Sequence, residues 1–328
     1  MVNEITTITG TGTGTATELA HANLARYAAE AQGAFAPNTV RALRADTAVF
    51  TAWCHGAGVP ALPASPQSVA DFIDAMRAAG KRPATIRRYV SSVAHLHRAA
   101  GLPVPSDSNS VKLALRRMMK GDGAAQRQAD GLTRRLVDRA LHAGGSRLRD
   151  LRNRALLAVA YDTLCRRSEL VALLRQDLQA GPHGDGSLLV RRGKTDQEGA
   201  GAVRFLAPDT MRLLLDWTGT AGIAEGPLFR SVRKGGRVGE ALDAGDVARL
   251  FKAMVRAAGL TAEQAARISG HSSRVGAAQD MAASDRIEMP AIMQAGGWKS
   301  PQMVARYTQR QAARRSGAAK LAELQNRT

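Results

Sequence analysis

Apolar residues recur every three or four positions through the first third of the chain, a spacing typical of helices that bury one face. Serine and proline at the starts of these stretches and glycine at their ends are helix boundary signals. The pattern predicts four helices, over residues 38–56, 66–80, 83–101 and 108–121. Because each carries an apolar face, we expect them to pack into one helical domain over residues 31–121.

The segments on either side of this domain lack such a face. Residues 1–30 begin with alternating Thr and Gly, which predicts a disordered arm. Residues 122–131 contain two glycines and no periodic apolar positions, which predicts a linker. The chain is therefore expected to contain a second domain after this linker.

The second domain, over residues 132–328, begins with a helical pattern near 132–143 and 147–165. Two short apolar runs at 188–190 and 203–206 then flank a polar, glycine-bearing turn, which predicts a β-hairpin. Most of the remaining chain to residue 324 has helical spacing. We therefore expect a mainly α fold, in which a helical N-terminal domain precedes a larger α-rich domain with a small β-sheet.

The charge of the chain narrows the class of partner. The formal net charge is +18, and residues 131–328 hold 32 basic and 19 acidic residues against 14 and 9 in residues 1–130. Such an excess favours a polyanion such as DNA, and it is concentrated in the second domain. A membrane surface is a weaker alternative, because no basic segment is paired with a large apolar helical face.

Cysteine usage and the absence of targeting signals bear on the compartment. Cys54 and Cys165 are the only cysteines, which is too few for a disulfide framework and is typical of a reducing compartment. The sequence shows no signal peptide, no long apolar run, and no zinc or calcium ligand pattern. We expect a cytoplasmic protein of bacterial, phage or plasmid origin that does not enter a membrane.

Several polar residues could together break a phosphodiester bond. That reaction requires a nucleophile, cations that bind the transition-state charge, and an acid for the departing oxygen. In chain order the candidates are Arg166, Glu169, Lys194 in the hairpin turn, His271, Arg274, Trp298 and Tyr307. Each alone is more simply explained by packing or by a surface ion pair. Their order and spacing, with His271 and Arg274 three residues apart at a helix start, make the set informative.

This ordered set resembles the tyrosine recombinase (phage integrase) family. The resemblance extends to residues 101–109 in the first domain and to residues 160–164, 269–278 and 292–298 in the second. We judge that it covers about residues 38–324. It implies two domains that clamp DNA, and a reaction that needs neither metal nor nucleotide.

The resemblance also implies a role for each site residue. Tyr307 would be the nucleophile and would form a 3′-phosphotyrosyl bond, while Arg166 and Arg274 would hold the scissile phosphate. His271 and Trp298 would donate further hydrogen bonds to it. Lys194 would be the acid for the departing 5′-hydroxyl, and Glu169 would orient Arg166 or His271.

Basic residues outside this set are candidates for DNA contact. In the first domain they are Lys81, Arg82, Arg87, Arg88, Arg116, Arg117 and Lys120. In the second domain Arg233 and Lys234 belong to a basic loop that precedes a predicted helix near 244–258. Their simplest alternative is a solvated surface. The expected partner is double-stranded DNA with an inverted-repeat recombination site.

The C-terminal segment 312–324 is expected to form a short amphipathic helix. Alone it could be a frayed end. In the family such a tail docks into a neighbouring subunit, which would give a tetramer across two DNA sites. The expected reaction is recombination through a Holliday junction, used in integration and excision or in resolving replicon dimers. The alternatives are a type IB topoisomerase or telomere resolvase, and a DNA-binding regulator without catalysis.

Overall fold

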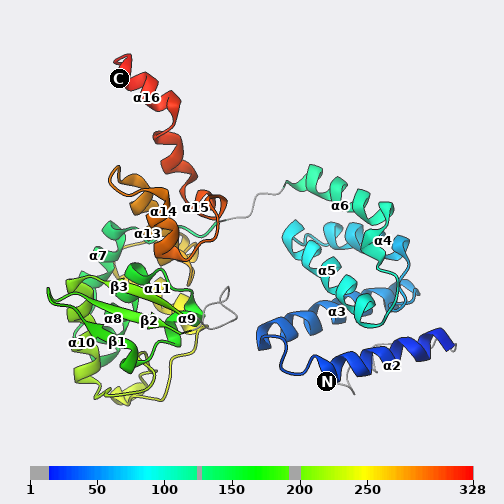
Figure 1. Cartoon of the computed structure of the whole chain (residues 1–328), viewed down its shortest axis with the longest axis horizontal. Coiled ribbons are helices and arrows are strands. Elements are labelled where there is room, and N and C mark those ends of the chain that lie inside the picture. The colour runs from blue at the N-terminus through cyan, green and yellow to red at the C-terminus, as the bar shows by residue number, and fades with distance from the viewer. Residues whose placement is uncertain (1–14, 124–127, 192–200, 328) are drawn as a thin grey trace. The chain divides into compact units, whose positions relative to one another are not determined.

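The computed structural model describes residues 15–123, 128–191 and 201–327 (Figure 1). The chain divides between residues 127 and 128 into two compact units, which we call the N-terminal and C-terminal units. Each has its own hydrophobic core. Helices dominate both, and the described residues contain one three-stranded sheet. The predicted mainly α fold with a small sheet is confirmed.

Helices make up the described part of the N-terminal unit. They are α2 (Thr15–Glu30), α3 (Pro37–Ala57), α4 (Pro66–Ala78), α5 (Pro83–Ala99), a 3₁₀ turn (Pro105–Asp107) and α6 (Asn109–Asp122). Ser65 caps α4 by accepting a hydrogen bond from the backbone of Ser68, so the predicted start signal acts as expected. The core between α3, α4, α5 and α6 contains the buried side chains of Phe50, Phe72, Ile86 and Met118.

Helix α2 corrects the prediction of a disordered arm over residues 1–30. Residues 1–14 lie outside the described part, but Thr15–Glu30 is helical. Leu24 and Ala20 are buried in a small cluster with Ala100 and Leu62. The Thr/Gly composition of the first residues hid this short apolar face, whose burial offsets the cost of ordering the helix.

The linker is also shorter than the predicted 122–131. Helix α6 continues through Asp122, and residues 124–127 lie outside the described part. The backbone N–H of Asp130 donates to the carbonyl of Arg267, and that of Leu132 donates to Ser272. Residues from 130 onwards are therefore hydrogen-bonded to the C-terminal unit.

The C-terminal unit packs its helices around the buried α8 and covers a small sheet. Its first elements are α7 (Arg134–His142), α8 (Leu148–Thr163), α9 (Arg167–Val171), β1 (Leu178–Ala180), β2 (Gly186–Val190), β3 (Ala202–Leu206) and α10 (Pro208–Thr220). The strands are antiparallel in the order β1-β2-β3, and Leu188 pairs with Arg204. The predicted hairpin is therefore β2 and β3. Strand β1 is additional, because three residues are too few to show an alternating pattern.

The remaining helices place the candidate site. They are α11 (Asp246–Ala257), α12 (Ala262–Ala266), α13 (Ser272–Ala283), α14 (Met289–Gly296), α15 (Pro301–Arg314) and α16 (Gly317–Leu324). The predicted tail helix over 312–324 is corrected to two helices, because α15 continues to Arg314 and Ser316 caps a separate α16. No helix in the ranges described is long and apolar enough to cross a membrane.

The two cysteines lie in different units, and both are free and buried. Burial raises the pKa of Cys54 to about 11 and that of Cys165 to about 11. Both thiols are therefore protonated near neutral pH, which makes them poor nucleophiles.

Candidate active site

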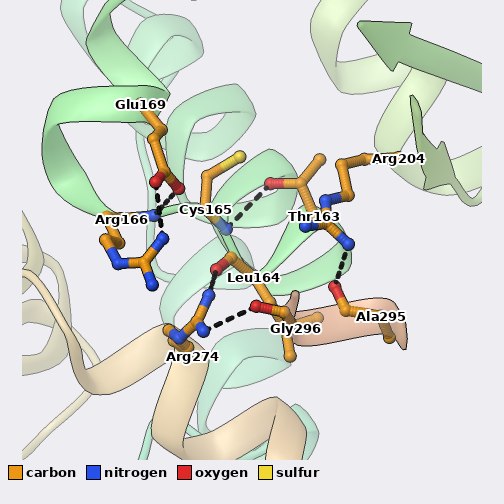
Figure 2. A network of polar contacts seen from close by, with 9 residues as sticks. All are labelled: Thr163, Leu164, Cys165, Arg166, Glu169, Arg204, Arg274, Ala295 and Gly296. Carbon is orange, nitrogen blue, oxygen red and sulfur yellow. Dashed lines mark hydrogen bonds and ion pairs between the residues drawn. The ribbon is translucent and has the colours of Figure 1, made fainter. Parts of the chain in front are cut away.

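Arg166 and Glu169 meet at the start of α9. Arg166 is the residue before the helix, and Glu169 is its third residue. One carboxylate oxygen of Glu169 accepts a hydrogen bond from the Arg166 backbone N–H at 2.8 Å, and the other accepts one from Nη1 of Arg166 at 2.7 Å (Figure 2). The sequence analysis left open whether Glu169 orients Arg166 or His271, and both of these hydrogen bonds go to Arg166. They fix both the helix start and the guanidinium.

Arg274, on the first turn of α13, is 2% exposed. Its Nη1 donates to the carbonyl of Leu164 and its Nη2 to the carbonyl of Gly296, each at 2.6 Å (Figure 2). The guanidinium lies 4.3 Å from the ring centre of Trp298. Its buried Nε makes no hydrogen bond with any described residue, so this N–H is available to a ligand.

Leu164 has the left-handed backbone conformation, with a φ of 52°. A residue with a branched side chain rarely adopts this conformation, and such strain is concentrated at functional sites. Here the turn ends α8 and leads into Cys165 and Arg166. The strained turn thus presents one carbonyl to Arg274 while the chain continues directly to Arg166.

Tyr307, on α15, is half-buried beside His271. Its hydroxyl lies 3.0 Å from Nε2 of His271, and the centre of its ring lies 5.7 Å from that of Trp298. The side-chain amide of Gln279 donates to the Tyr307 carbonyl at 3.2 Å. The helix deviates directly after the tyrosine, at Thr308, where the backbone is not helical. The nucleophile candidate and its neighbours therefore converge.

The electrostatics of this group favour an anion. Burial, followed by the charges of Arg274 and Arg166, lowers the pKa of His271 to about 4. Burial and the charge of Arg166 lower the pKa of Arg274 to about 10. At neutral pH His271 is thus neutral and can accept a proton, whereas Arg274 is charged. The guanidiniums of Arg166 and Arg274 outnumber the carboxylate of Glu169, which leaves positive charge for a bound anion.

Trp298 follows the end of α14 and is 4% exposed. Gly297 ends the helix in the left-handed conformation, and the Trp298 N–H donates to the carbonyl of Met293 at 2.9 Å. Nη1 of Arg204, on β3, donates to the carbonyls of Gln294 at 2.6 Å and Ala295 at 2.7 Å. Arg204 was not predicted, because a contact ninety residues away leaves no local signal in the sequence.

Lys194 lies outside the described residues, which stop at Arg191 and resume at Gly201. The strands on either side of it are paired, with Val190 opposite Ala202. Of the seven predicted site residues, the structure therefore describes six. It brings Arg166, Glu169, His271, Arg274, Trp298 and Tyr307 together.

The predicted DNA-contact residues are all exposed on their own unit. Five of the seven in the N-terminal unit make no ion pair with a described residue: Lys81, Arg82, Arg87, Arg116 and Lys120. Arg88 differs, because it pairs at 2.9 Å with the buried Asp46. Arg117 pairs with Asp74 at 3.4 Å. Arg233 and Lys234 project from a loop of the C-terminal unit.

Comparisons with known proteins match both units. Residues 132–314 match the phage integrase family, and residues 26–101 match the phage integrase N-terminal SAM-like domain. The chain is 33% identical over 290 residues to recombinase cre of Escherichia phage P1, covering 84% of each chain. It is 32% identical over 284 residues to an integrase/recombinase xerD homolog of Selenomonas ruminantium, covering 83% of this chain and 81% of the other.

Solved structures share the fold. A lambda integrase tetramer bound to a Holliday junction has a TM-score of 0.60 at 19% identity, over 88% of this chain and 76% of that one. XerH site-specific recombinase, in a post-cleavage complex with palindromic difH substrate, has a TM-score of 0.59 at 19% identity, over 79% and 72%. At these identities the likeness establishes the arrangement of elements and not the roles of residues.

Proposed function

This chain belongs to the phage integrase family, and from that premise we propose that it is a tyrosine site-specific recombinase, which cuts and rejoins DNA. The membership expected from the motifs is confirmed. Similarity to two recombinases over more than four fifths of the chain supports enzymatic strand exchange. The net charge of +18 is suited to a DNA partner.

The observation that carries the mechanism is the 3.0 Å contact between the Tyr307 hydroxyl and Nε2 of His271. Because His271 is neutral, it can accept the phenolic proton as the Tyr307 oxygen bonds to phosphorus. The bond from phosphorus to the 5′ oxygen breaks in the same displacement. Lys194, assigned from the family resemblance, gives that oxygen its proton.

Arg166 and Arg274 would bind the non-bridging oxygens of the phosphate. Glu169 orients the first guanidinium, and two backbone carbonyls orient the second, so both are held before DNA arrives. The free Nε of Arg274 would gain a partner from a phosphate oxygen. Such preorganised donors stabilise developing charge without rearranging during the reaction.

The phosphotyrosyl bond conserves the energy of the broken phosphodiester. A 5′-hydroxyl from a second duplex can therefore attack it in the reverse reaction, which gives strand exchange through a Holliday junction. The reaction would take place in the bacterial cytoplasm, on two inverted-repeat sites. Integration and excision of a mobile element, or resolution of replicon dimers, are uses that such a reaction serves.

Binding would involve both units. The exposed cations of the N-terminal unit and of the loop with Arg233 and Lys234 would contact phosphates. Helix α16 leaves Leu321 51% and Leu324 82% exposed. We assign this apolar face to a neighbouring protomer, so that four protomers assemble on two sites.

The decisive experiment compares the wild type with Tyr307→Phe on a duplex selected from a random library by binding to the protein. After denaturation in SDS, the wild type should retain covalently bound DNA and the variant should not. Tyr89→Phe is the matched control, because its ring is buried in the N-terminal unit. If the wild type binds the duplex but forms no adduct, the protein is a DNA-binding regulator without catalysis. That result would overturn the proposed enzymatic activity.

A second measurement separates the recombinase from a topoisomerase or telomere resolvase. Two labelled duplexes of different length, each with the selected site, are incubated with the wild type. A recombinase yields duplexes with exchanged arms. Relaxation or hairpin formation without exchanged products would overturn recombination while leaving the tyrosine chemistry intact.

A further inference from the structure

Two arginines bind three consecutive carbonyls at the end of α14. Arg204 donates to the carbonyl of Gln294. Arg204 also donates to the carbonyl of Ala295, and Arg274 donates to that of Gly296 (Figure 2). The last carbonyls of a helix have no partner within the helix and carry partial negative charge. Binding by two guanidiniums therefore fixes the position of this helix end.

The end of α14 determines where Trp298 lies. The Gly297 N–H bonds back to the carbonyl of Gln294, which is one of the two carbonyls that Arg204 holds. One residue later, the Trp298 ring lies over Arg274 and beside Tyr307. A shift of Gln294 or Ala295 would thus be transmitted within three or four residues to groups that surround the phosphate.

Arg204 itself belongs to a different part of the site. It lies on β3, opposite Leu188 of β2, and Lys194 belongs to the segment of the sequence between these two strands. Its neighbours Val203 and Phe205 are 61% and 60% exposed, so Arg204 points to the opposite, inner face of the strand. A charge on that face needs a polar partner, and the carbonyls of α14 supply it.

We infer that Arg204 is a positioning residue for the recombination reaction, which holds the end of α14 and thereby Trp298 and Arg274 around the scissile phosphate. This inference rests on the proposed function. Arg204 acts through these groups and does not contact DNA. Its loss should therefore slow the chemical step while leaving the affinity for DNA unchanged, because DNA affinity is spread over many phosphate contacts.

The first test measures binding and cleavage separately on the selected duplex. Arg204→Gln should form the covalent adduct roughly 10- to 100-fold more slowly at saturating protein, as expected for a small displacement of catalytic groups. Its dissociation constant should stay within about twofold of the wild-type value. Arg204→Lys retains a positive donor but loses the planar fork, so its rate should lie between the two.

Arg212→Gln is the matched control. Arg212 is exposed on α10 in the same unit and makes no ion pair with a described residue. Replacing it with Gln removes the same charge as Arg204→Gln and leaves the contacts of α14 unchanged. It should cleave at the wild-type rate. Cleavage by Arg204→Gln at the wild-type rate, or a loss of rate fully explained by weaker binding, would overturn the inference. Should Arg204→Gln fail to fold, the same comparison with Arg204→Lys decides.

A second substrate identifies which groups Arg204 positions. The cleavage position is mapped on the wild-type adduct, and the 5′ bridging oxygen there is replaced by sulfur, which departs without an acid. Because Arg204 acts through Trp298 and Arg274, Arg204→Gln should remain slower than wild type by the same factor on this substrate.

If Arg204→Gln forms the adduct at the wild-type rate on the sulfur substrate, Arg204 acts through the proposed acid Lys194. That result would overturn the assignment to Trp298 and Arg274. A wild type that forms no adduct on either substrate would defeat the proposed function itself. The two failures are therefore distinguishable.

Discussion

Two regions of the C-terminal unit, the candidate site around Arg274 and the C-terminal helix α16, differ in how firmly the chain itself holds them. Arg274 is 2% exposed and bonded to carbonyls from two distant segments, whereas α16, only ten residues after Tyr307, has no buried residue. The chain is held as far as Arg315, which donates to the carbonyls of Ala282 and Ser284. Beyond it, α16 extends away from the rest of its unit (Figure 1).

This difference shows which parts of the protein one chain completes. The arginines that we propose to bind phosphate are preorganised by bonds within the chain, so the proposed chemistry needs only DNA to reach them. The tail keeps two leucines in water, and burying a leucine is worth roughly 1.5–3 kcal/mol. That free energy becomes available only when another surface covers α16. In the proposed assembly, the tail gains its stability from a neighbouring protomer.

Arg274→Lys tests the candidate site, the firmly held region, and should have the largest effect. A lysine ammonium cannot span the carbonyls of Leu164 and Gly296 or present a fork to phosphate. Adduct formation on the selected duplex should slow by about 10²–10³, the usual loss for one charge-stabilising donor. Arg212→Lys on α10 should retain the wild-type rate. An Arg274→Lys enzyme that cleaves normally would mean that the buried guanidinium does not bind phosphate.

Gly276→Ala tests the backbone packing next to the candidate site, where α13 lies against Leu132 and Thr133. A Cβ at Gly276 would overlap the backbone carbonyl of Leu132 and the amide of Thr133, which cannot move as a side chain could. We expect the free energy of unfolding, measured with urea, to fall by roughly 3 kcal/mol. Gly219→Ala on α10 meets no atom within 4 Å and should be neutral or stabilising. Equal stability of the two variants would contradict the close approach.

The titration of His271 gives a smaller, electrostatic test. Its pKa is about 4 in the folded protein, below its usual value of 6.5, so the folded state binds fewer protons than the unfolded state between these values. The contribution of His271 to stability is thus present above about pH 6.5 and is lost as the pH falls towards 4. NMR of the DNA-free protein should show a neutral imidazole from pH 5.5 to 8.

Arg166→Gln sharpens this test. Removing a nearby positive charge should raise the pKa of His271, whose lowering is due to burial first and to Arg274 and Arg166 next. The acid loss of stability should become shallower. A His271 that titrates near 6.5 in the wild type, or whose pKa falls in the variant, would contradict the electrostatics derived above.

Much of this organisation was predictable from local signals. Serine and proline starts and glycine ends gave the helices now seen as α4 and α5, and the polar turn between two apolar runs gave β2 and β3. The candidate site residues were identified by their order and spacing over the whole domain, and the six that the structure describes lie together. The helix and hairpin signals depend on neighbours within a few residues, where sequence and structure correspond most directly.

What could not be predicted depends on distant parts of the chain. Arg204 reaches α14 across ninety residues, and α2 is ordered by packing near Ala100. Arg88, which we predicted to contact DNA, pairs with the buried Asp46, a partner that the sequence did not indicate. In each case the partner is determined by tertiary contacts. From the sequence alone, the same residue is equally compatible with a solvated surface.

The smallest effect on a single chain is expected at the tail. A double variant with Leu321→Ser and Leu324→Ser should change the free energy of unfolding by no more than about 0.5 kcal/mol, because both side chains are already more than half exposed. Assembly should nevertheless fail, since the apolar face offered to a neighbour is gone. Native gels of protein with the selected duplex should show single-duplex complexes in place of the two-duplex complex.

Lys320→Ser is the control on the same helix, because it introduces the same residue and leaves both leucines. It should assemble as the wild type does. If the leucine variant pairs two duplexes normally, a neighbouring protomer does not need this face. If it unfolds more than 1 kcal/mol more easily, the leucines are buried within their own chain in solution. Either result would remove the contrast between a self-sufficient site and a tail completed by its neighbour.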